Sequence, residues 1–222
     1  YNYQLEDLDK ALVDYNKAVD LDPEDSYNYE LRGDFYKDYL NDYDKALEDY
    51  NKGIELNPTD PDLHFSKGYL LSNQEKPDLA LKSYLEVVRL EPENLYIYNN
   101  IAILYINYIK DYQKALAYYS KEIELNPKYS NTYKNRALLY TNQLEDLDKA
   151  LEDYTKAIDL DPENSYYYNF RGDFYQYYTN DYDKALEDYN KGIELNPTNP
   201  DLHFQKGYLL QDETPDLALK SY

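Results

Sequence analysis

The chain has 222 residues, with 44 acidic and 23 basic side chains that give a formal net charge of −21. Such a surface repels phosphate backbones and anionic lipid headgroups, which argues against nucleic acid and membranes as partners. No apolar run approaches the roughly 18 residues that cross a bilayer. The absence of cysteine excludes disulfides, thiolate metal sites and a cysteine nucleophile, but it leaves the cellular compartment undetermined.

Tyrosine is the dominant aromatic residue, with 32 copies against five phenylalanines and no tryptophan. The core must therefore use tyrosine where other proteins use Phe, Leu or Trp. Each buried ring then needs a partner, or solvent, for its hydroxyl group. A thin, two-layer architecture suits this composition, because its rings can lie flat with the hydroxyl at the rim.

One stretch of the sequence occurs twice without change, at residues 41–59 and again at 180–198, an offset of 139 residues. Looser copies begin at Asp7, Pro77, Asp111 and Asp146. This self-similarity predicts a repeat architecture, in which no unit buries its apolar face alone and about three stacked units are needed for stability.

Each copy is predicted to be an amphipathic helix that ends at a proline. In the copy at 41–59 the apolar and small side chains follow the i, i+1, i+4, i+7, i+8 spacing of one helix face, and they are Ala46, Leu47, Tyr50, Gly53 and Ile54. Charged residues lie on the other faces. Pro58 ends the helix, because the residue before a proline is pushed out of the α region.

A second helix is predicted in front of this one. Tyr29, Gly33 and Tyr36 follow a possible cap at Asp25 or Ser26, and a turn comes near residues 41–42. Together with the helix described above, this spacing resembles the tetratricopeptide repeat (TPR), whose pattern is W-x2-L-G-x2-Y…A-x3-F…P. Tyrosine stands in for Trp and Phe, and Arg32 for Leu. The resemblance implies an all-α, right-handed superhelical solenoid of TPR helix-turn-helix units.

The same repeat spacing recurs along the whole chain, which predicts one continuous array. The expected units are residues 1–25 (partial), 26–60, 61–94, 95–129, 130–164, 165–199 and 200–222 (partial). Four units span the 139-residue super-period. The longer units are explained by one extra residue in the turn between their two helices, and the last second helix is expected to open at Pro215. With no methionine and no polar cap after Leu219, we expect a slice of a longer chain.

Several motifs that could signal a special site are interpreted structurally. The tripeptide RGD occurs at Arg32 and again at Arg171, but it falls inside a predicted helix, where the arginine is expected to reach a neighbouring carboxylate. The two histidines, His64 and His203, lie four units apart, so we expect packing or surface roles.

Paired carboxylates such as Asp42 with Asp44, or Glu48 with Asp49, recur in every repeat on the predicted outer face, which is typical of a solubilising surface. A catalytic pair would be singular and buried. We therefore predict no enzyme, no cofactor and no metal. A calcium site between carboxylates of adjacent units remains an alternative, although no contiguous calcium-binding loop occurs.

The resemblance implies binding along the concave face, which the first helices of the units line. The expected lining is Tyr27, Glu30, Asp34, Tyr69, Asn73, Asn99, Ile103, Lys134, Leu138, Asn169, Asp173, Phe204 and Tyr208. A clamp for carboxylate tails is rejected, because only the cluster from Lys134 to Arg136 offers cations. A basic or neutral extended peptide fits this lining better. Carbohydrate is a second possibility, and simple core and rim packing is a third.

Two functions remain open at this level. The first is a non-catalytic scaffold that binds protein or peptide partners along its concave face. The second is a structural building unit of a long repeat fibre or cell-surface appendage, with self-association end to end. Both classes of protein need the same fold, so the fold alone does not choose between them.

Overall fold

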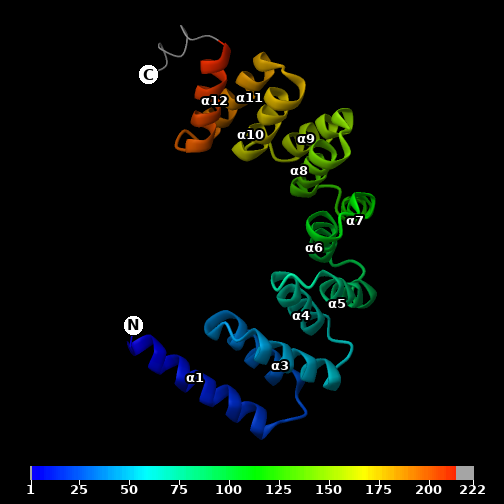
Figure 1. Cartoon of the computed structure of the whole chain (residues 1–222), viewed down its shortest axis with the longest axis vertical. Coiled ribbons are helices and arrows are strands. Elements are labelled where there is room, and N and C mark those ends of the chain that lie inside the picture. The colour runs from blue at the N-terminus through cyan, green and yellow to red at the C-terminus, as the bar shows by residue number, and fades with distance from the viewer. Residues whose placement is uncertain (1, 214–222) are drawn as a thin grey trace. The chain divides into compact units, whose positions relative to one another are not determined.

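The computed structural model describes residues 2–213 (Figure 1), and the side chains of residues 7–211. The described residues form α-helices and short π-helical turns, and no strand occurs among them, so the all-α prediction is confirmed. The chain divides into two compact units, Tyr1–Asp111 and Tyr112–Tyr222. The expected helix start at Pro215 lies outside the described residues.

The helices alternate along the chain with short turns. The N-terminal unit contains α1 (Asn2–Leu21), α2 (Ser26–Phe35), η1 (Tyr36–Leu40), α3 (Tyr43–Leu56), α4 (Pro61–Asn73), α5 (Pro77–Leu90), α6 (Leu95–Leu104) and η2 (Tyr105–Ile109). The C-terminal unit contains α7 (Tyr112–Leu125), α8 (Ser130–Leu139), η3 (Tyr140–Leu144), α9 (Leu147–Leu160), α10 (Ser165–Phe174), η4 (Tyr175–Thr179), α11 (Tyr182–Leu195) and α12 (Pro200–Glu213). The π-helical turns are labelled η.

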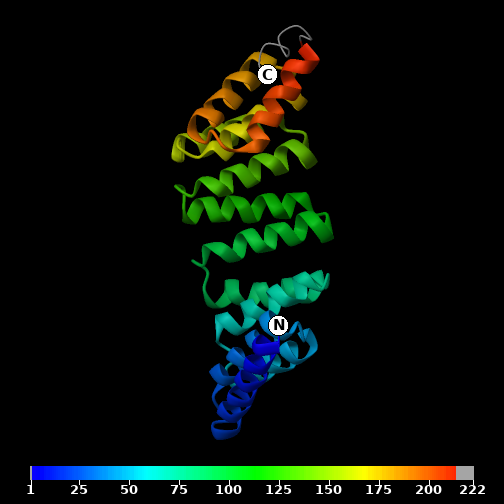
Figure 2. The same cartoon turned by 90° about the vertical axis from the view of Figure 1, so that its left-hand side faces the viewer.

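Within each compact unit, helices joined by a short turn pack against each other, and the second helix of a pair packs on the first helix of the next pair. In the N-terminal unit α2 packs on α3 and α4 on α5, while α3 contacts α4 and α5 contacts α6. In the C-terminal unit α8 packs on α9 and α10 on α11, with α7, α9 and α11 contacting the first helix of the following pair. Figure 2 shows neighbouring helices lying side by side within each unit. The predicted solenoid of helix pairs is confirmed.

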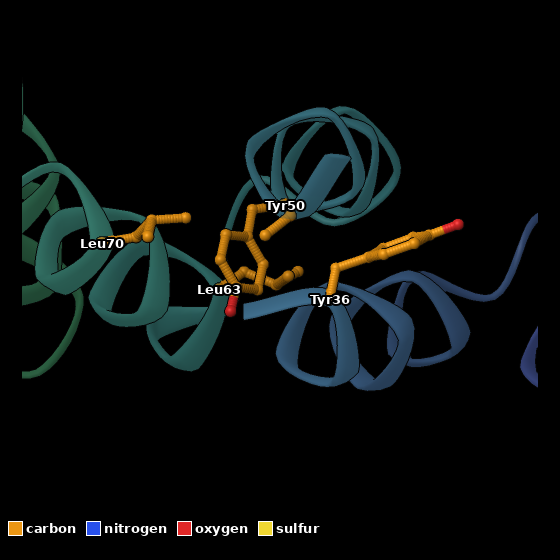
Figure 3. Close-up of a cluster of buried hydrophobic side chains, with 5 residues drawn as sticks. Tyr36, Tyr50, Leu63 and Leu70 are labelled. Atoms are coloured by element: carbon orange, nitrogen blue, oxygen red, sulfur yellow. The ribbon is translucent and has the colours of Figure 1, made fainter. Parts of the chain in front are cut away.

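The predicted apolar face of the second helices forms the core. Ala46 and Tyr50 are fully buried in α3, and Tyr50 lies against Leu63 of the next helix (Figure 3). Gly33 allows the Tyr50 ring to approach the backbone of α2 closely, since a Cβ at this position would lie only 2.8 Å from the ring. Such close packing makes the hairpin sensitive to the addition of a single methyl group.

The extra residue of the longer units lies in a π-helical turn at the end of the first helix. Each of the four turns is followed by a residue in the left-handed conformation: Asn41, Lys110, Glu145 and Asn180, with φ between 52° and 62°. After η1, the amide of Asp42 donates to the carbonyl of Tyr36 at 2.9 Å. The hairpin of α4 and α5 has no such turn, so the added residue widens the last turn of the first helix.

Tyrosine hydroxyls connect four of the described first helices, α2, α6, α8 and α10, to the preceding repeat. The Tyr98 hydroxyl donates to the carbonyl oxygen of Pro92 at 2.6 Å, and three equivalent tyrosines bond the preceding closing proline at 3.1–3.2 Å: Tyr29, Tyr133 and Tyr168. The two histidines take the same position, with Nε2 of His64 lying 3.1 Å from the Pro58 carbonyl. At this repeat position, a ring whose polar group is hydrogen-bonded replaces the tryptophan of the family pattern.

Arginines in three first helices form a second link between repeats. Arg171 donates through two nitrogens to Asp188 of its own hairpin, both at 2.8 Å, and through a third to Thr155 of the preceding second helix at 3.3 Å. Arg32 and Arg136 do the same with Asp49 and Asp153. The prediction that Asp49 lies on the solvated outer face is therefore wrong, because its carboxylate is buried against Arg32 of the same hairpin. The expectation that the arginine of RGD reaches a neighbouring carboxylate is confirmed. Its glycine is buried inside the hairpin, and its aspartate is partly exposed.

Candidate interaction face

The expected lining residues lie on one side of the first helices, here called the first-helix face. In α2 the spacing of Tyr27, Glu30 and Asp34 places them on one helix face, while Tyr29 and Gly33 of the same helix are buried. Tyr27 is 57% exposed, and Phe204 of α12 is 70% exposed. The face therefore presents large rings to solvent in both units.

Carboxylates gather where α2 meets the start of α4. Burial, together with the negative charges of Asp60, Asp34 and Asp62, raises the pKa of Glu30 to about 7, and the charge of Lys37 opposes this rise. A half-buried carboxyl among like charges favours its protonated form. Any cation that approaches this place relieves the repulsion.

Two of the predicted binding carboxylates also stabilise the fold. Asp34 accepts hydrogen bonds from the Tyr50 hydroxyl at 2.7 Å and from Lys37 at 2.8 Å. Asp173 accepts from the Tyr189 hydroxyl at 2.8 Å, and burial raises the pKa of Asp173 to about 6. Their orientation is thus fixed by core tyrosines before any partner arrives.

Stacked aromatic pairs occupy equivalent places in the two units. In α4 the rings of Phe65 and Tyr69 lie 6.5 Å apart at 14°, and in α12 those of Phe204 and Tyr208 lie 6.4 Å apart at 16°. Both tyrosines are exposed. A parallel pair of rings on a helix surface offers a flat face for stacking by a partner.

Some of the remaining candidate residues already contact other side chains of the protein. Lys134 donates to Asn135 at 2.7 Å and lies over the Phe170 ring at 5.2 Å, and burial lowers its pKa. Arg136 is paired with Asp153. This cluster therefore leaves no free guanidinium for a carboxylate tail. Asn73 is exposed at the end of α4, Ile103 is exposed in α6, and three others are half-buried, namely Asn99, Leu138 and Asn169.

Sequence reasoning missed two exposed tyrosines on the same face. Tyr96 is 71% exposed and Tyr166 also faces solvent, both at the first-helix position that Tyr27 occupies in α2. The signal was available in the repeat register, since the three residues align. They extend the aromatic part of the face along α6 and α10.

Within residues 2–213 no group of three or more ionisable side chains is placed to hold a metal ion. In the same range no helix is both long enough and apolar enough to span a bilayer. The geometry of the first-helix face, with oriented carboxylates beside exposed rings, suits non-covalent binding.

Models of repeat families match most of the sequence. One described as "TPR repeat" matches residues 39–75 and 176–212. Two described as "Tetratricopeptide repeat" match residues 1–25 with 131–164, and residues 65–130. No curated protein is significantly similar to the chain in sequence.

Solved structures share the fold at low identity. YrrB, described as "a TPR protein with an unusual peptide-binding site", is 22% identical, with 86% of this chain and 97% of YrrB covered and a TM-score of 0.64. PilF of Pseudomonas aeruginosa is 20% identical over 88% of this chain and 87% of its own, with a TM-score of 0.68. MamA is 24% identical over 78% and 92%, at 0.66. With its repeat models, helix pairs and register in agreement, the chain belongs to the tetratricopeptide repeat family, as a tandem array.

Proposed function

We propose that the chain is a non-catalytic scaffold that binds an extended protein or peptide segment along the first-helix face. The observation that carries this proposal is the exposure of large rings at three repeat positions of the first-helix face: Tyr27, Tyr96 and Tyr166 at the first, Phe204 at the second, and Tyr69 and Tyr208 at the third. Rings at these positions contribute little to the core. Tyrosine is enriched where proteins bind other proteins, because it adds large contact area with few rotatable bonds.

Preorganisation supports the same proposal. The carboxylates beside the rings are held by hydrogen bonds from core tyrosines, as at Asp34 and Asp173. A face that is ordered before binding loses little conformational entropy when a partner docks. The net charge of −21 favours basic or neutral segments and disfavours acidic ones. The peptide-binding site named for YrrB is a precedent on the same fold.

A second proposal is a structural one, in which such arrays form a fibre or surface appendage by end-to-end contacts. It is favoured by the identical stretches at 41–59 and 180–198, since near-exact block duplication is typical of extended repeat assemblies. Electron microscopy of the purified chain at increasing concentration tests it. Filaments would support it, and particles of constant length at every concentration would rule it out.

The scaffold proposal is tested by selecting ligands from a random peptide display library and measuring their affinity by fluorescence anisotropy. Replacing Tyr27 or Phe204 by serine is expected to weaken binding about tenfold, as for aromatic anchors at interfaces. Tyr43→Ser and Leu85→Ser are matched controls, because both residues are exposed but lie on second helices. Equal losses for the two pairs, or no selected ligand at all, would refute the scaffold proposal.

A further inference from the structure

The two units carry the same face with different charge. The rings and helices match at an offset of 139 residues, so that Phe65 with Tyr69 corresponds to Phe204 with Tyr208. The polar residues around these rings do not match. The molecule thus contains two copies of one surface, and the differences in charge between them indicate which partner segments each copy binds.

In the N-terminal unit five carboxylates and one cation gather on α2, η1 and the start of α4, and these are Glu30, Asp34, Asp38, Asp60, Asp62 and Lys37. Lys37 is already engaged, at 2.8 Å from Asp34 and 3.6 Å from Asp38. Within the described residues no ion pair involves Glu30, Asp60 or Asp62, and Asp60 caps α4 by accepting from the amides of Asp62 and Leu63. Negative charge exceeds positive charge by four.

In the C-terminal unit three of the five carboxylates are replaced. Asn169, Tyr177 and Asn199 stand where the first copy has Glu30, Asp38 and Asp60. Asp173 and Asp201 remain, and the position of Lys37 is Gln176. Asn199 keeps the capping role, since its Oδ1 accepts from the amide of Asp201 at 3.0 Å. The replacement therefore removes charge without removing the local structure.

We propose that the face shared by α2 and α4 binds arginine- or lysine-bearing segments of a partner, and that the equivalent face of α10 and α12 binds them more weakly. This inference rests on the proposed scaffold function and specifies its partner. A guanidinium or ammonium group would stack on the exposed ring of Tyr69 while its charge meets the carboxylates of α2 and α4. A segment with acidic side chains would be repelled by the same groups.

Burial and charge make the N-terminal face the tighter one. Glu30 is half-buried, so a cation that pairs with it is shielded from water more than one at a fully exposed carboxylate. Because the pKa of Glu30 is raised to about 7, cation binding competes with a proton there. Affinity is therefore expected to rise from pH 6 to pH 8, with Asp34, Asp60, Asp62 and Lys37 as the other ionisable groups facing Glu30.

The test uses the full chain and a fluorescein-labelled eight-residue peptide of glycine and serine with two arginines, beside the same peptide with citrulline in place of arginine. Citrulline keeps the shape and removes the charge. The dissociation constant is measured by anisotropy at 150 mM salt. The arginine peptide is expected to bind at least about fivefold more tightly than the citrulline peptide, as for partly buried ion pairs.

The chain itself supplies the variants. Glu30→Asn with Asp60→Asn converts the first face to the residues of the second, and it is expected to weaken arginine-peptide binding about fivefold and to abolish the rise with pH. Asn169→Glu with Asn199→Asp makes the reverse change and is expected to tighten binding. Both sets of residues already occur on this fold, so neither variant should unfold. Asp44→Asn with Glu48→Gln removes the same charge from exposed positions of α3.

Two results would overturn the inference. The first is equal affinity for the arginine and citrulline peptides, and the second is a loss of arginine-peptide affinity in the α3 variant as large as that in the variant of Glu30 and Asp60. Failure to bind either peptide would overturn it as well. These results leave the scaffold proposal intact if ligands from the unbiased library still depend on Tyr27 and Phe204. The two proposals therefore fail separately.

Discussion

The carboxyl group of Glu122 is expected to make the stability of the C-terminal unit depend on pH. Glu122 lies in α7 and is 1% exposed, at the repeat position that Gly53 and Ala157 hold in other second helices. It faces the start of α8, where burial raises its pKa to about 7, and the nearby Thr132 hydroxyl offsets this in part. Within the described residues Glu122 Oε2 and Thr132 Oγ1 are buried and have no hydrogen-bond partner.

The size of the effect follows from the pKa. In the unfolded chain the carboxyl has its ordinary value of 4.5, so the folded state holds the proton more tightly. The stability that Glu122 contributes is greatest below pH 4.5, falls as the pH rises, and is lost just above pH 7. Each pKa unit corresponds to about 1.4 kcal/mol, so the loss between pH 4.5 and pH 8 is about 3 kcal/mol.

Glu122→Gln removes the titration while keeping the size of the side chain. We expect wild type to lose about 3 kcal/mol more than this variant between pH 4.5 and pH 8 in urea unfolding. The comparison cancels other raised carboxyl groups such as Glu30 and Asp173. Hydrogen exchange should locate the difference in α7 and α8. Glu124→Gln is the matched control, because Glu124 is exposed in the same helix.

Parallel pH curves for wild type and Glu122→Gln would refute this reasoning, since they would mean that the buried carboxyl titrates as it does in the unfolded chain. The same would follow if Glu124→Gln altered the pH dependence as strongly as Glu122→Gln. In either case the interface between α7 and α8 would have to admit water or a counterion in solution.

Three further substitutions test the packing. Asp188→Ala removes the carboxylate that pairs with Arg171 and should lower the unfolding free energy by about 3 kcal/mol in urea, and an unchanged midpoint would contradict the link. Gly172→Ala places a Cβ 2.6 Å from a core tyrosine ring and should cost about 1–3 kcal/mol by thermal unfolding, so a neutral result would refute the close approach. Glu145→Gly, at φ 53°, should raise the unfolding free energy by about 0.5–1 kcal/mol, whereas Asp148→Gly in α9 should lower it by about 1 kcal/mol. A change of the same sign for both variants would contradict the turn geometry.

The sequence predicted the helix pairs because the repeat pattern is local and is written several times. Spacing such as that of Ala46, Tyr50 and Pro58 defines a helix, its buried face and its end without reference to distant residues. The arginine contact to a carboxylate was also predictable, since the repeat register places Arg171 and Asp188 in the same hairpin.

Other features depend on three-dimensional contacts and were not predicted. The π-helical turns arise from fitting one added residue between helices whose packing is fixed, and the left-handed residue at Glu145 gives no sequence signal. The bond from Tyr98 to the carbonyl of Pro92 joins two repeats through a backbone group. On the first-helix face, Asp34 belongs to the proposed binding surface and also accepts a hydrogen bond from the Tyr50 hydroxyl, and this second role depends on the three-dimensional position of the Tyr50 ring.

Hydrogen exchange of the chain with and without a bound peptide ligand tests the central claim most directly. The scaffold account predicts that a saturating ligand slows exchange in the first helices, foremost in α2, α4, α10 and α12, and leaves α3, α5 and α11 unchanged. Slowed exchange confined to the second helices would contradict it, because the partner would then be held by the surface opposite the exposed rings.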